Sequence, residues 1–381
     1  MTQSSVHSLI LKVGTGKLTL SVIADDSQTG GFLTERFEVA YDGIINGFFC
    51  SEKNFNLSLK SLFKKAKKVY KKIFSIKTLY VCLPEEFTSV VKRISTLEFS
   101  SRQVISYEHL NALKEIAERD FVNNEKYTIK YITVESFTVD DKVFGNKLTS
   151  DTVSENYISM KTNIVLLKRR AVLAIENALF NISDFQLKVF TVTDAIASSI
   201  KTSSEQEKEY LLIDISENST AFCYISNDRF CALRNFSLGL NVFVKPLMNK
   251  YRLGLEDALK VLTQFNVYSN AGDKKIEVSL ENNKLSLKIL DIFNCINAGQ
   301  IKDFFLYTRK AYDEIKTFIP YDIKVIFTGD GMAVSGMDNL LREKLRINDY
   351  SKFKLKDSFR SVGIISAEQY VLNNYSKVNN E

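Results

Sequence analysis

The stretch that decides the fold is residues 209–241, EYLLIDISENSTAFCYISNDRFCALRNFSLGLN. Residues 211–215, 221–225 and 230–236 are apolar runs of strand-forming residues, and polar turns at 216–219 and 227–228 separate them. Such runs joined by tight turns predict a three-stranded antiparallel meander. Asp214 lies at the end of the first strand, where proteins often place a carboxylate that meets a metal-bound phosphate.

The same design opens the chain. Residues 8–13, 18–23 and 32–41 read as strands, and they are joined by a Gly-Thr-Gly-Lys turn at 14–17 and a longer turn at 25–31. Two meanders far apart in the sequence, each followed later by a helix, indicate an internal repeat at the scale of a domain. The sequence therefore predicts a duplicated α/β core.

Composition excludes several classes of protein. The chain has 381 residues, of which 45% are hydrophobic and 12% aromatic, which predicts a globular protein of two or more domains. No apolar run approaches the roughly 20 residues that cross a bilayer, and residues 1–6 do not read as a secretory signal. Five cysteines without CxxC spacing favour a reducing compartment, and two histidines argue against a histidine-rich metal site.

Residues 56–74 predict an amphipathic helix with an apolar face and a lysine-rich face. The lysines of this segment and of the residues just after it are Lys60, Lys64, Lys65, Lys67, Lys68, Lys71, Lys72 and Lys77. They are either a solvated face of a packed helix or a surface that attracts anionic lipid or an acidic partner.

The remaining segments alternate between strands and helices. Residues 85–160 read as a small α+β module inserted into the first half, with a helix at 107–121 that Ser106 caps and a strand at 127–139. Strands at 157–167 and 185–191 flank a helix at 168–181. After the second meander we expect helices at 242–251 and 254–265, a hairpin at 276–289, one long helix at 292–319, a strand at 323–327 and a helix at 336–345.

Taken together, these segments resemble the actin/Hsp70/sugar-kinase superfold, and within it FtsA, the actin-like bacterial cell-division protein. The stretches that carry the resemblance are YDGIINGFFCSEKNF, IKTLYVCLP, YITVESFTVDD, LKVFTVTDAIASSI, LLIDISENSTAFCYISNDRF, VIFTGDGMAVSGMDNLLREKL and SFRSVGIISA. Each is weak alone, but their order and spacing cover nearly the whole chain. The module after IKTLYVCLP is similar to the SHS2-type subdomain that FtsA and the pilus protein PilM carry.

The resemblance implies a two-lobed, ribonuclease H-like duplicated fold. Its first lobe would comprise residues 1–84 and 161–208, interrupted by the SHS2-type insertion at 85–160. Its second lobe would begin at 209–247, continue through a subdomain at 248–318 and end with 319–381. Asp194 would begin the first connecting helix and residues 361–363 the second.

The resemblance also implies a nucleotide site between the lobes. Gly14, Thr15, Gly16 and Lys17 would form the first phosphate turn. Asp214, Ser216 and Ser219 would belong to the second, where Asp214 would hold Mg²⁺ through water. Asp257 and Lys260 would meet the nucleoside, as would Gly329, Asp330 and Gly331. Read alone, these glycines serve equally well as ordinary hairpin and strand-to-helix turns.

Two departures from the family bear on the cofactors, ATP and Mg²⁺. Lys12 stands where the family carries an acid, and the second turn has Ser216-Glu217-Asn218 in place of a glycine run. A Cβ hinders the approach of backbone to a phosphate, and Glu217 adds a like charge that costs about 1–4 kcal/mol at about 4 Å. ATP binding and its absence both stay open, and hydrolysis is less expected than binding.

The function that the resemblance implies is an adaptor rather than an enzyme. An FtsA-like protein would lie at the inner face of the cell membrane at the division site, bind the C-terminal peptide of FtsZ and other division proteins, and assemble into filaments. Residues 370–381 make a poor membrane-binding helix, so peripheral membrane contact stays open, and no nucleic acid is expected. The alternatives are a PilM-like cytoplasmic scaffold that binds a membrane-protein peptide, and an ATP-dependent enzyme of the sugar-kinase type.

Overall fold

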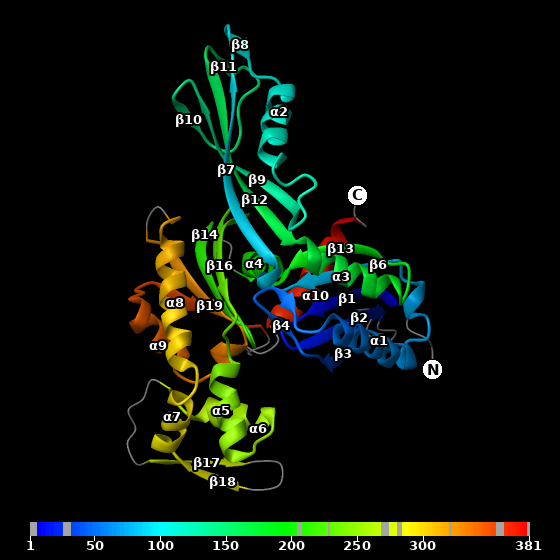
Figure 1. The fold of residues 1–381 in the computed structure, drawn as a ribbon, viewed down its shortest axis with the longest axis vertical. Helices are drawn as coiled ribbons and strands as arrows, with labels where there is room; N and C mark the ends of the chain where they lie inside the picture. The colour runs from blue at the N-terminus through cyan, green and yellow to red at the C-terminus, as the bar shows by residue number, and fades with distance from the viewer. Residues whose placement is uncertain are drawn as a thin grey trace.

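Two five-stranded sheets form the centre of the molecule (Figure 1). The computed structural model describes residues 6–25, 32–203, 208–227, 229–267, 274–279, 284–319, 322–355 and 362–378. Among the predicted features, the turns at 25–31 and 282–283 and residue Ser361 lie wholly or largely outside these residues.

The two sheets have the same topology. The first contains β1 (Val6–Val13), β2 (Lys17–Asp25), β3 (Phe32–Ala40), β6 (Thr78–Leu83) and β13 (Gln186–Thr191), in the order β13-β6-β1-β2-β3. The second contains β14 (Glu209–Ile215), β15 (Thr220–Ser226), β16 (Arg229–Phe236), β19 (Lys324–Thr328) and β20 (Tyr350–Lys352), in the order β16-β15-β14-β19-β20. In each sheet, three consecutive strands form an antiparallel meander. Two further strands extend the sheet on the other side of the first strand and run parallel to it. The predicted duplication is confirmed.

Alternating side chains bury both faces of each sheet. Leu9 and Leu11 face α1 (Glu52–Val69) and α3 (Arg169–Phe180), whereas Ile10 faces the space between the sheets. That space holds α4 (Val192–Ser203) and α10 (Val362–Val378), which share one apolar core with both sheets. On the far side, α5 (Asn241–Tyr251), α8 (Ile301–Lys316) and α9 (Met337–Leu345) cover the second sheet. The result is five alternating layers of helices and strands.

An ion pair with a buried carboxylate fastens α10 to the first sheet. Glu368 accepts hydrogen bonds from Ser21 Oγ at 2.6 Å and from two guanidinium nitrogens of Arg36 at 2.6 and 2.7 Å. Bidentate pairing of this kind fixes direction as well as distance. The last helix of the chain is therefore anchored on β2 and β3, near its beginning.

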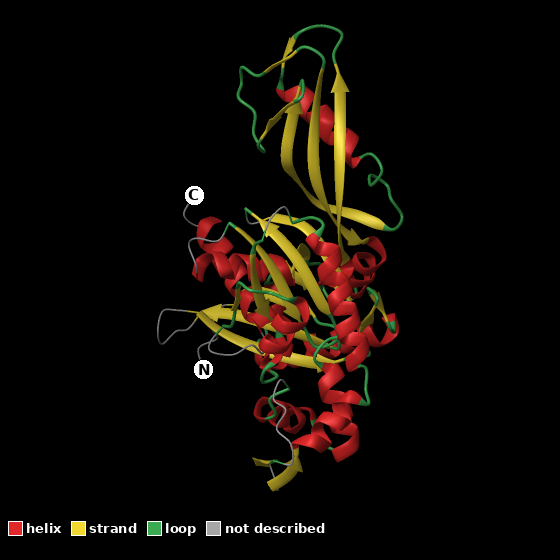
Figure 2. Cartoon of the chain, turned by 90° about the vertical axis from the view of Figure 1, so that its left-hand side faces the viewer, coloured by secondary structure: helices red, strands yellow, loops and turns green. Residues whose placement is uncertain are grey.

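The module inserted after β6 has a sheet and a core of its own. Its strands are β7 (Thr88–Glu98), β9 (Tyr127–Val139), β10 (Lys142–Phe144) and β12 (Tyr157–Lys168), in the order β10-β9-β12-β7, with α2 (Tyr107–Glu118) packed against them. Ser106 caps α2 as predicted, together with His109. β12 pairs with β7 along almost its whole length and so runs across residue 160. Figure 2 shows this module standing apart from the body of the molecule.

The tip of the second lobe contains α6 (Leu255–Gln264), β17 (Lys275–Ser279), β18 (Lys284–Lys288) and α7 (Ile289–Asn297). The prediction of one long helix over 292–319 is wrong, because the chain turns at residues 298–300 between α7 and α8. A Cβ on Gly299 would lie 3.0 Å from Pro246 Cγ, so this turn packs tightly on α5. Short elements complete the fold: β4 (Ile44–Ile45), β5 (Phe48–Phe49), η1 (Ile73–Ser75), β8 (Gln103–Val104), β11 (Val153–Ser154), η2 (Glu85–Phe87) and η3 (Asp330–Ala333).

Two predictions about the whole chain can be compared with the structure. Within the described ranges, no helix is both long and apolar enough to cross a membrane. All five cysteines are free thiols.

Candidate functional site

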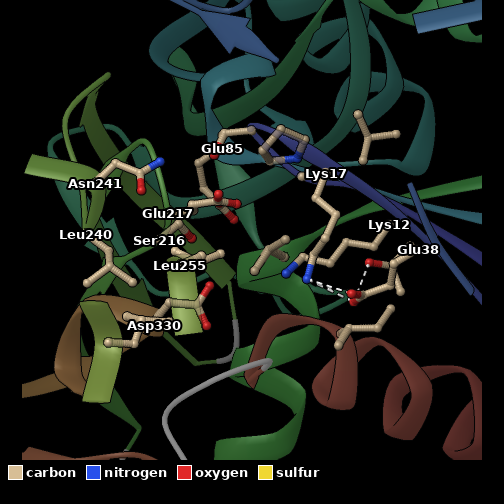
Figure 3. A pocket seen from close by; sticks show the side chains of 18 residues that line it. Lys12, Lys17, Glu38, Glu85, Ser216, Glu217, Leu240, Asn241, Leu255 and Asp330 are labelled. Carbon is tan, nitrogen blue, oxygen red and sulfur yellow. Dashed lines mark hydrogen bonds and ion pairs between the residues drawn. The ribbon is translucent and has the colours of Figure 1, made fainter. Parts of the chain in front are cut away.

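A small cleft lies where the two meanders meet (Figure 3). Its volume is about 120 Å³, and its walls come from both lobes. Among its lining residues are Lys12, Gly14, Thr15, Lys17, Glu38, Glu85, Ser216, Glu217, Leu240, Asn241, Leu255, Leu259 and Asp330. Five of the predicted site residues thus line it: Gly14, Thr15, Lys17, Ser216 and Asp330.

The first turn is fixed by its own backbone. Gly14 N–H donates to Lys17 O at 2.9 Å, and Ile44 N–H donates to Thr15 O at 3.1 Å. Neither Gly14 nor Gly16 has a positive φ. A Cβ at Gly14 would nevertheless lie 2.7 Å from Lys17 O, so the tight hairpin alone explains this glycine.

The second turn closes on itself and on α5. Ser216 N–H donates to Ser219 O at 2.9 Å, and the first amides of α5, those of Leu240 and Asn241, donate to Ser216 O and Glu217 O. Gly239 permits this approach, because a Cβ there would lie 2.3 Å from Ser216 O. Amides that would otherwise be available to a phosphate are therefore used within the protein.

Asn218 joins the two turns directly. Its backbone N–H donates to Thr15 Oγ1 at 3.2 Å, and its side-chain amide donates to Thr15 O at 3.2 Å. Asn241 Nδ2 donates in turn to Asn218 Oδ1 at 2.6 Å. We call this set of hydrogen bonds the Asn218 latch. It places a protein side chain between the turns that would enclose a phosphate chain.

Acidic groups outnumber the cations in the cleft lining. Glu38, Glu85, Glu217 and Asp330 line the cleft, against only Lys12 and Lys17. Lys17, the predicted phosphate lysine, pairs with Glu38 at 2.9 Å, which neutralises much of its charge. With Lys17 and Glu38 paired, Glu217 and Asp330 still outnumber Lys12, which disfavours a polyphosphate in the cleft.

Asp214 and the late glycine turn pack together beneath the cleft. Asp214 is 2% exposed and accepts a hydrogen bond from Ser216 Oγ at 2.9 Å. Burial raises the pKa of this carboxyl group to about 6. Gly331 packs against Ile215, because a Cβ there would lie 2.2 Å from Ile215 Cγ2. The late glycines therefore have a packing role in addition to any contact with a ligand.

Gly329 has a strict conformational requirement, and Gly329→Ala should destabilise the protein by at least about 3 kcal/mol. Its φ is +92°, and a Cβ there would lie 2.2 Å from Asp214 Oδ1. Urea unfolding measures the effect. Gly145→Ala is the control, because a Cβ at Gly145 meets nothing within 4 Å. A Gly329→Ala variant as stable as this control would contradict the assigned packing.

Asp257 and Lys260 pair with each other rather than with the cleft. They form an ion pair of 3.0 Å along α6, and the lining residues from this helix are Leu255 and Leu259. Ser219 is buried in the second turn. Gly16 packs against the Asn218 side chain, because a Cβ on Gly16 would lie 3.1 Å from Asn218 Nδ2. The structure therefore brings the two turns together and leaves the predicted nucleoside pair outside.

Two buried acids beside the cleft were not predicted as site residues. Glu85 accepts hydrogen bonds from the Thr193 N–H and Oγ1, both at 2.6 Å, and Glu86 accepts one from Ser237 Oγ at 3.0 Å. Burial raises the pKa of each to about 7, and the nearby Asp214 carboxylate adds to the effect on Glu85. Glu85 binds the start of α4 in the first lobe, whereas Glu86 binds the second lobe. In the sequence, the feature that could have indicated these site residues is a pair of glutamates just after the buried strand β6.

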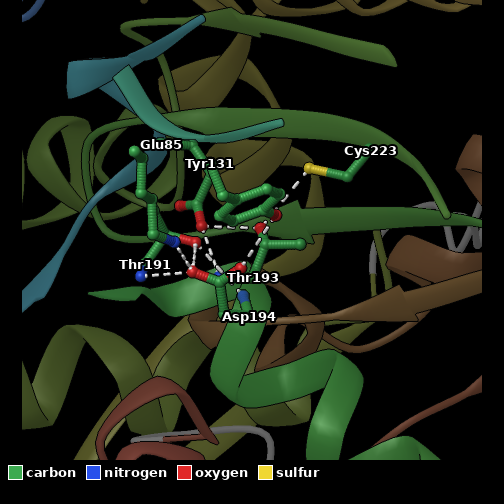
Figure 4. A network of polar contacts seen from close by, with 7 residues as sticks. Glu85, Tyr131, Thr191, Thr193, Asp194 and Cys223 are labelled. Atoms are coloured by element: carbon green, nitrogen blue, oxygen red, sulfur yellow. Dashed lines mark hydrogen bonds and ion pairs between the residues drawn. The ribbon is translucent and has the colours of Figure 1, made fainter. Parts of the chain in front are cut away.

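Asp194, predicted to begin a connecting helix, is the centre of a polar network (Figure 4). It accepts hydrogen bonds from Thr191 N–H and Oγ1 at 2.7 Å and from the Tyr131 hydroxyl at 3.3 Å, and it forms an ion pair with Lys130. Burial raises the pKa of Tyr131. Because Lys130 and Tyr131 lie on β9, the network ties the inserted module to the first lobe.

These observations decide whether the residues present fit a nucleotide with Mg²⁺. A site for a molecule of that size usually encloses about 300–1,000 Å³, far more than this cleft. The Asn218 latch fills the space between the turns, and the lining is acidic. Among the described residues no cluster of three or more acidic, histidine or cysteine side chains is arranged to hold a metal. The residues do not fit the group in this arrangement.

A larger hollow runs along α3 beneath the inserted module. One part has a volume of about 590 Å³ and is lined by Glu52, Asn123, Glu125, Arg169, Arg170, Leu173, Ala174 and Asn177. A second part has a volume of about 390 Å³. It shares Asn123, Arg169 and Leu173 with the first part and adds residues that follow α2 and residues at the start of β9. A third, about 230 Å³, shares Glu52 and Arg170 and reaches Phe48. We call these three connected hollows the α3 groove.

Comparison with known proteins identifies the fold. Neither a protein-family model nor a curated protein sequence matches the chain. The structure of the PilM–PilN type IV pilus biogenesis complex is similar, with a TM-score of 0.55 and 13% identity over 91% of this chain and 88% of that one. MreB5 of Spiroplasma citri bound to ADP has a TM-score of 0.46 and 12% identity over 98% of each chain. A MamK double helical filament has a TM-score of 0.47 and 10% identity over 96% of this chain and 99% of that one.

The chain is therefore a protein of the actin-like fold. The duplicated sheets, the helices between them and the interlobe cleft define this class, and the similarity to the PilM–PilN complex agrees with it. Its structural neighbours include nucleotide-bound proteins, an ADP-bound MreB among them. At these low identities the comparison establishes the fold alone.

Proposed function

We propose that this chain is an actin-like adaptor that binds a short segment of a partner protein in the α3 groove. The observation that carries the proposal is the contrast between its two hollows. The interlobe cleft has about 120 Å³, and the Asn218 latch joins the two turns beside it, whereas the largest part of the groove has about 590 Å³ and is open.

The groove suits an extended peptide. β10 pairs with β9 only at residues 137–139, so the edge of β9 that faces away from β12 has no described strand beside it from Tyr127 to Ser136. An extended peptide can add to such an edge through main-chain hydrogen bonds. Val122 and Leu173, which are 56% and 45% exposed, offer apolar contacts beside it, and Arg169 and Glu125 offer charged ones.

Two partners are compatible with such an adaptor. In the FtsA-like form, the chain would bind the FtsZ C-terminal peptide, act at the septum on the inner face of the membrane, and self-assemble. In the PilM-like form, it would bind a cytoplasmic segment of a membrane protein. The open groove and the similarity to the PilM–PilN complex support the PilM-like form.

We propose no catalytic turnover for either form. A kinase of this fold would need a carboxylate free to act as a base next to bound nucleotide. Asp214 is buried and hydrogen-bonded to Ser216, and Glu85 is bound by the start of α4. Asp214 is not among the residues that line the cleft, and the Glu85 carboxylate, which does line it, is held by the amide and hydroxyl of Thr193.

Leu173→Glu and Val122→Glu should each weaken peptide binding at least about tenfold, because each places a charge on an apolar wall of the groove. Fluorescence anisotropy with two sets of probes tests this: the FtsZ C-terminal peptide, and cytoplasmic segments of membrane proteins encoded by neighbouring genes. Val143→Glu is the matched control, since Val143 is 75% exposed on β10 of the same module and outside the groove.

The identity of the bound peptide separates the two forms. Groove-dependent binding of the FtsZ peptide supports the FtsA-like form, and groove-dependent binding of a membrane-protein segment supports the PilM-like form. Binding that Leu173→Glu and Val143→Glu affect equally would place the partner elsewhere and contradict the proposal.

A further inference from the structure

The surplus positive charge of this protein is concentrated on one segment. Residues 60–77 contain eight lysines and no acidic residue. The formal charge of the whole chain is +6, so the rest of the chain carries +6 − 8 = −2. The segment is therefore a local basic surface on an otherwise slightly acidic protein, not a sample of a generally basic one.

Packing turns the lysines outward. α1 buries Phe55, Leu59, Leu62, Phe63 and Ala66 against the first sheet. Lys60, Lys64, Lys67 and Lys68 follow at helical spacing on the opposite side and are exposed, and Lys71 and Lys72 continue the surface just after the helix. We call these six residues the lysine face. Figure 1 shows α1 on the outer side of the first sheet.

The lysine face is not neutralised by the protein. None of its six lysines forms an ion pair with an acidic side chain in the described part of the chain. Lys67 lies over the Phe74 ring at 5.1 Å, and the adjacent Lys65 donates to the backbone carbonyl of Glu38 at 3.1 Å. Neither contact supplies a negative charge. The charges are therefore available to an external anionic surface.

We propose that the lysine face docks on an anionic lipid bilayer. The residues are all lysines, with no arginine between Arg36 and Arg93, and lysine acts as a flexible point charge that needs no fixed geometry in its partner. None of the four hollows described above is lined by the lysine face.

An apolar residue on the same helix completes the surface. Leu57, which falls between Lys64 and Lys68 around the axis of α1, is 57% exposed. Apolar side chains flanking lysines can enter the interfacial region of a bilayer once the charges have brought them there. A nucleic acid would instead favour arginine forks and exposed aromatic platforms, and no exposed aromatic side chain lies on α1 between the lysines.

Docking in this way would also place the α3 groove near the bilayer. Glu52, the first residue of α1, lines the groove. A segment of a membrane protein would then meet the groove close to where it leaves the bilayer. The lysine-face proposal stands on its own observations, however, and does not depend on what the groove binds.

Co-sedimentation of the full chain with lipid vesicles tests the proposal. Vesicles of equal parts phosphatidylcholine and phosphatidylglycerol should bind the protein at low salt, and pure phosphatidylcholine vesicles should not. Replacing Lys60, Lys64, Lys67 and Lys68 with glutamine should weaken binding at least about a hundredfold, at about fivefold per lysine. High salt should abolish binding, because it screens the attraction.

The matched control replaces four exposed lysines of the second lobe, Lys245, Lys302, Lys310 and Lys344, with glutamine. This variant has the same net charge and should bind vesicles like the wild type. Equal losses in the two variants would show that net charge alone decides, and would overturn the proposal. An unchanged lysine-face variant would overturn it as well, as would tighter binding to duplex DNA than to the anionic vesicles. Unchanged melting temperatures verify that both variants fold.

Discussion

Calorimetry should show no saturable binding of ATP with Mg²⁺ to the wild-type chain at millimolar concentrations. The double variant Glu217→Gly/Asn218→Gly should bind ATP with Mg²⁺ at least about tenfold more tightly than the wild type. Asn218 joins the two turns across the cleft, and Glu217 lies beside them in the lining. Removing a like charge at about 4 Å is worth about 1–4 kcal/mol, and each lost hydrogen bond of the latch about 0.5–1.5 kcal/mol. Both changes favour a bound phosphate chain over the closed turns.

The chain contains its own control for this experiment. Residues 154–156 repeat the Ser-Glu-Asn sequence of residues 216–218, but they belong to the inserted module, where Glu155 and Asn156 are exposed. Glu155→Gly/Asn156→Gly makes the same chemical change away from the cleft and should leave ATP binding undetectable. Micromolar binding by the wild type would show that the latch opens readily, and it would contradict our assignment of a closed cleft.

Stability should fall between about pH 4.5 and pH 7, with Glu86 as a main cause. Burial raises the pKa of Glu86 from 4.5 to about 7, so the folded protein binds a proton that the unfolded chain has already released. The stabilisation is fully present below about pH 4.5 and is lost as the pH rises through 7. A shift of this size corresponds to about 3 kcal/mol. Glu85, which burial affects similarly, and Asp214 act in the same direction.

Urea unfolding of Glu86→Gln at several pH values tests this expectation. The variant stays neutral at every pH, so it should match the wild type near pH 4.5 and exceed its stability by up to about 3 kcal/mol near pH 8. Glu98→Gln, at an exposed position on β7, should follow the wild-type curve throughout. If Glu86→Gln has the same pH profile as Glu98→Gln, Glu86 is ionised in the folded protein and the assigned burial is wrong.

The duplicated core could be predicted from the sequence because its central strands are buried on both faces. Runs such as residues 211–213 are continuously apolar for that reason, and tight turns mark where the strands end. The break between α7 and α8 could not be predicted in the same way. Buried apolar positions recur on both sides of residues 298–300, at Ile296 and Ile301, and the turn between them packs tightly on Pro246, which lies far away in the sequence.

The resemblance assigned the two turns to one site, and the structure brings them together. The side chain that lies between the turns is fixed by the hydrogen bond between Asn218 and Thr15. These residues are 203 positions apart, so no local sequence pattern predicts their contact. The same holds for Glu85, whose role depends on the amide and hydroxyl of Thr193 at the start of α4.

The ion pair between α10 and the first sheet has a consequence for how the protein is made. Ser21 and Glu368 are separated by 347 residues, so their contact is among the last that a growing chain can form. The outer core of the first lobe draws on residues 9–189 and can assemble early on the ribosome. The space between the sheets, by contrast, stays exposed until α10 has been synthesised and released. We therefore expect the newly made chain to pass through a state in which one lobe is folded and the apolar surface between the two sheets is still exposed. In that state the chain should depend most on chaperones.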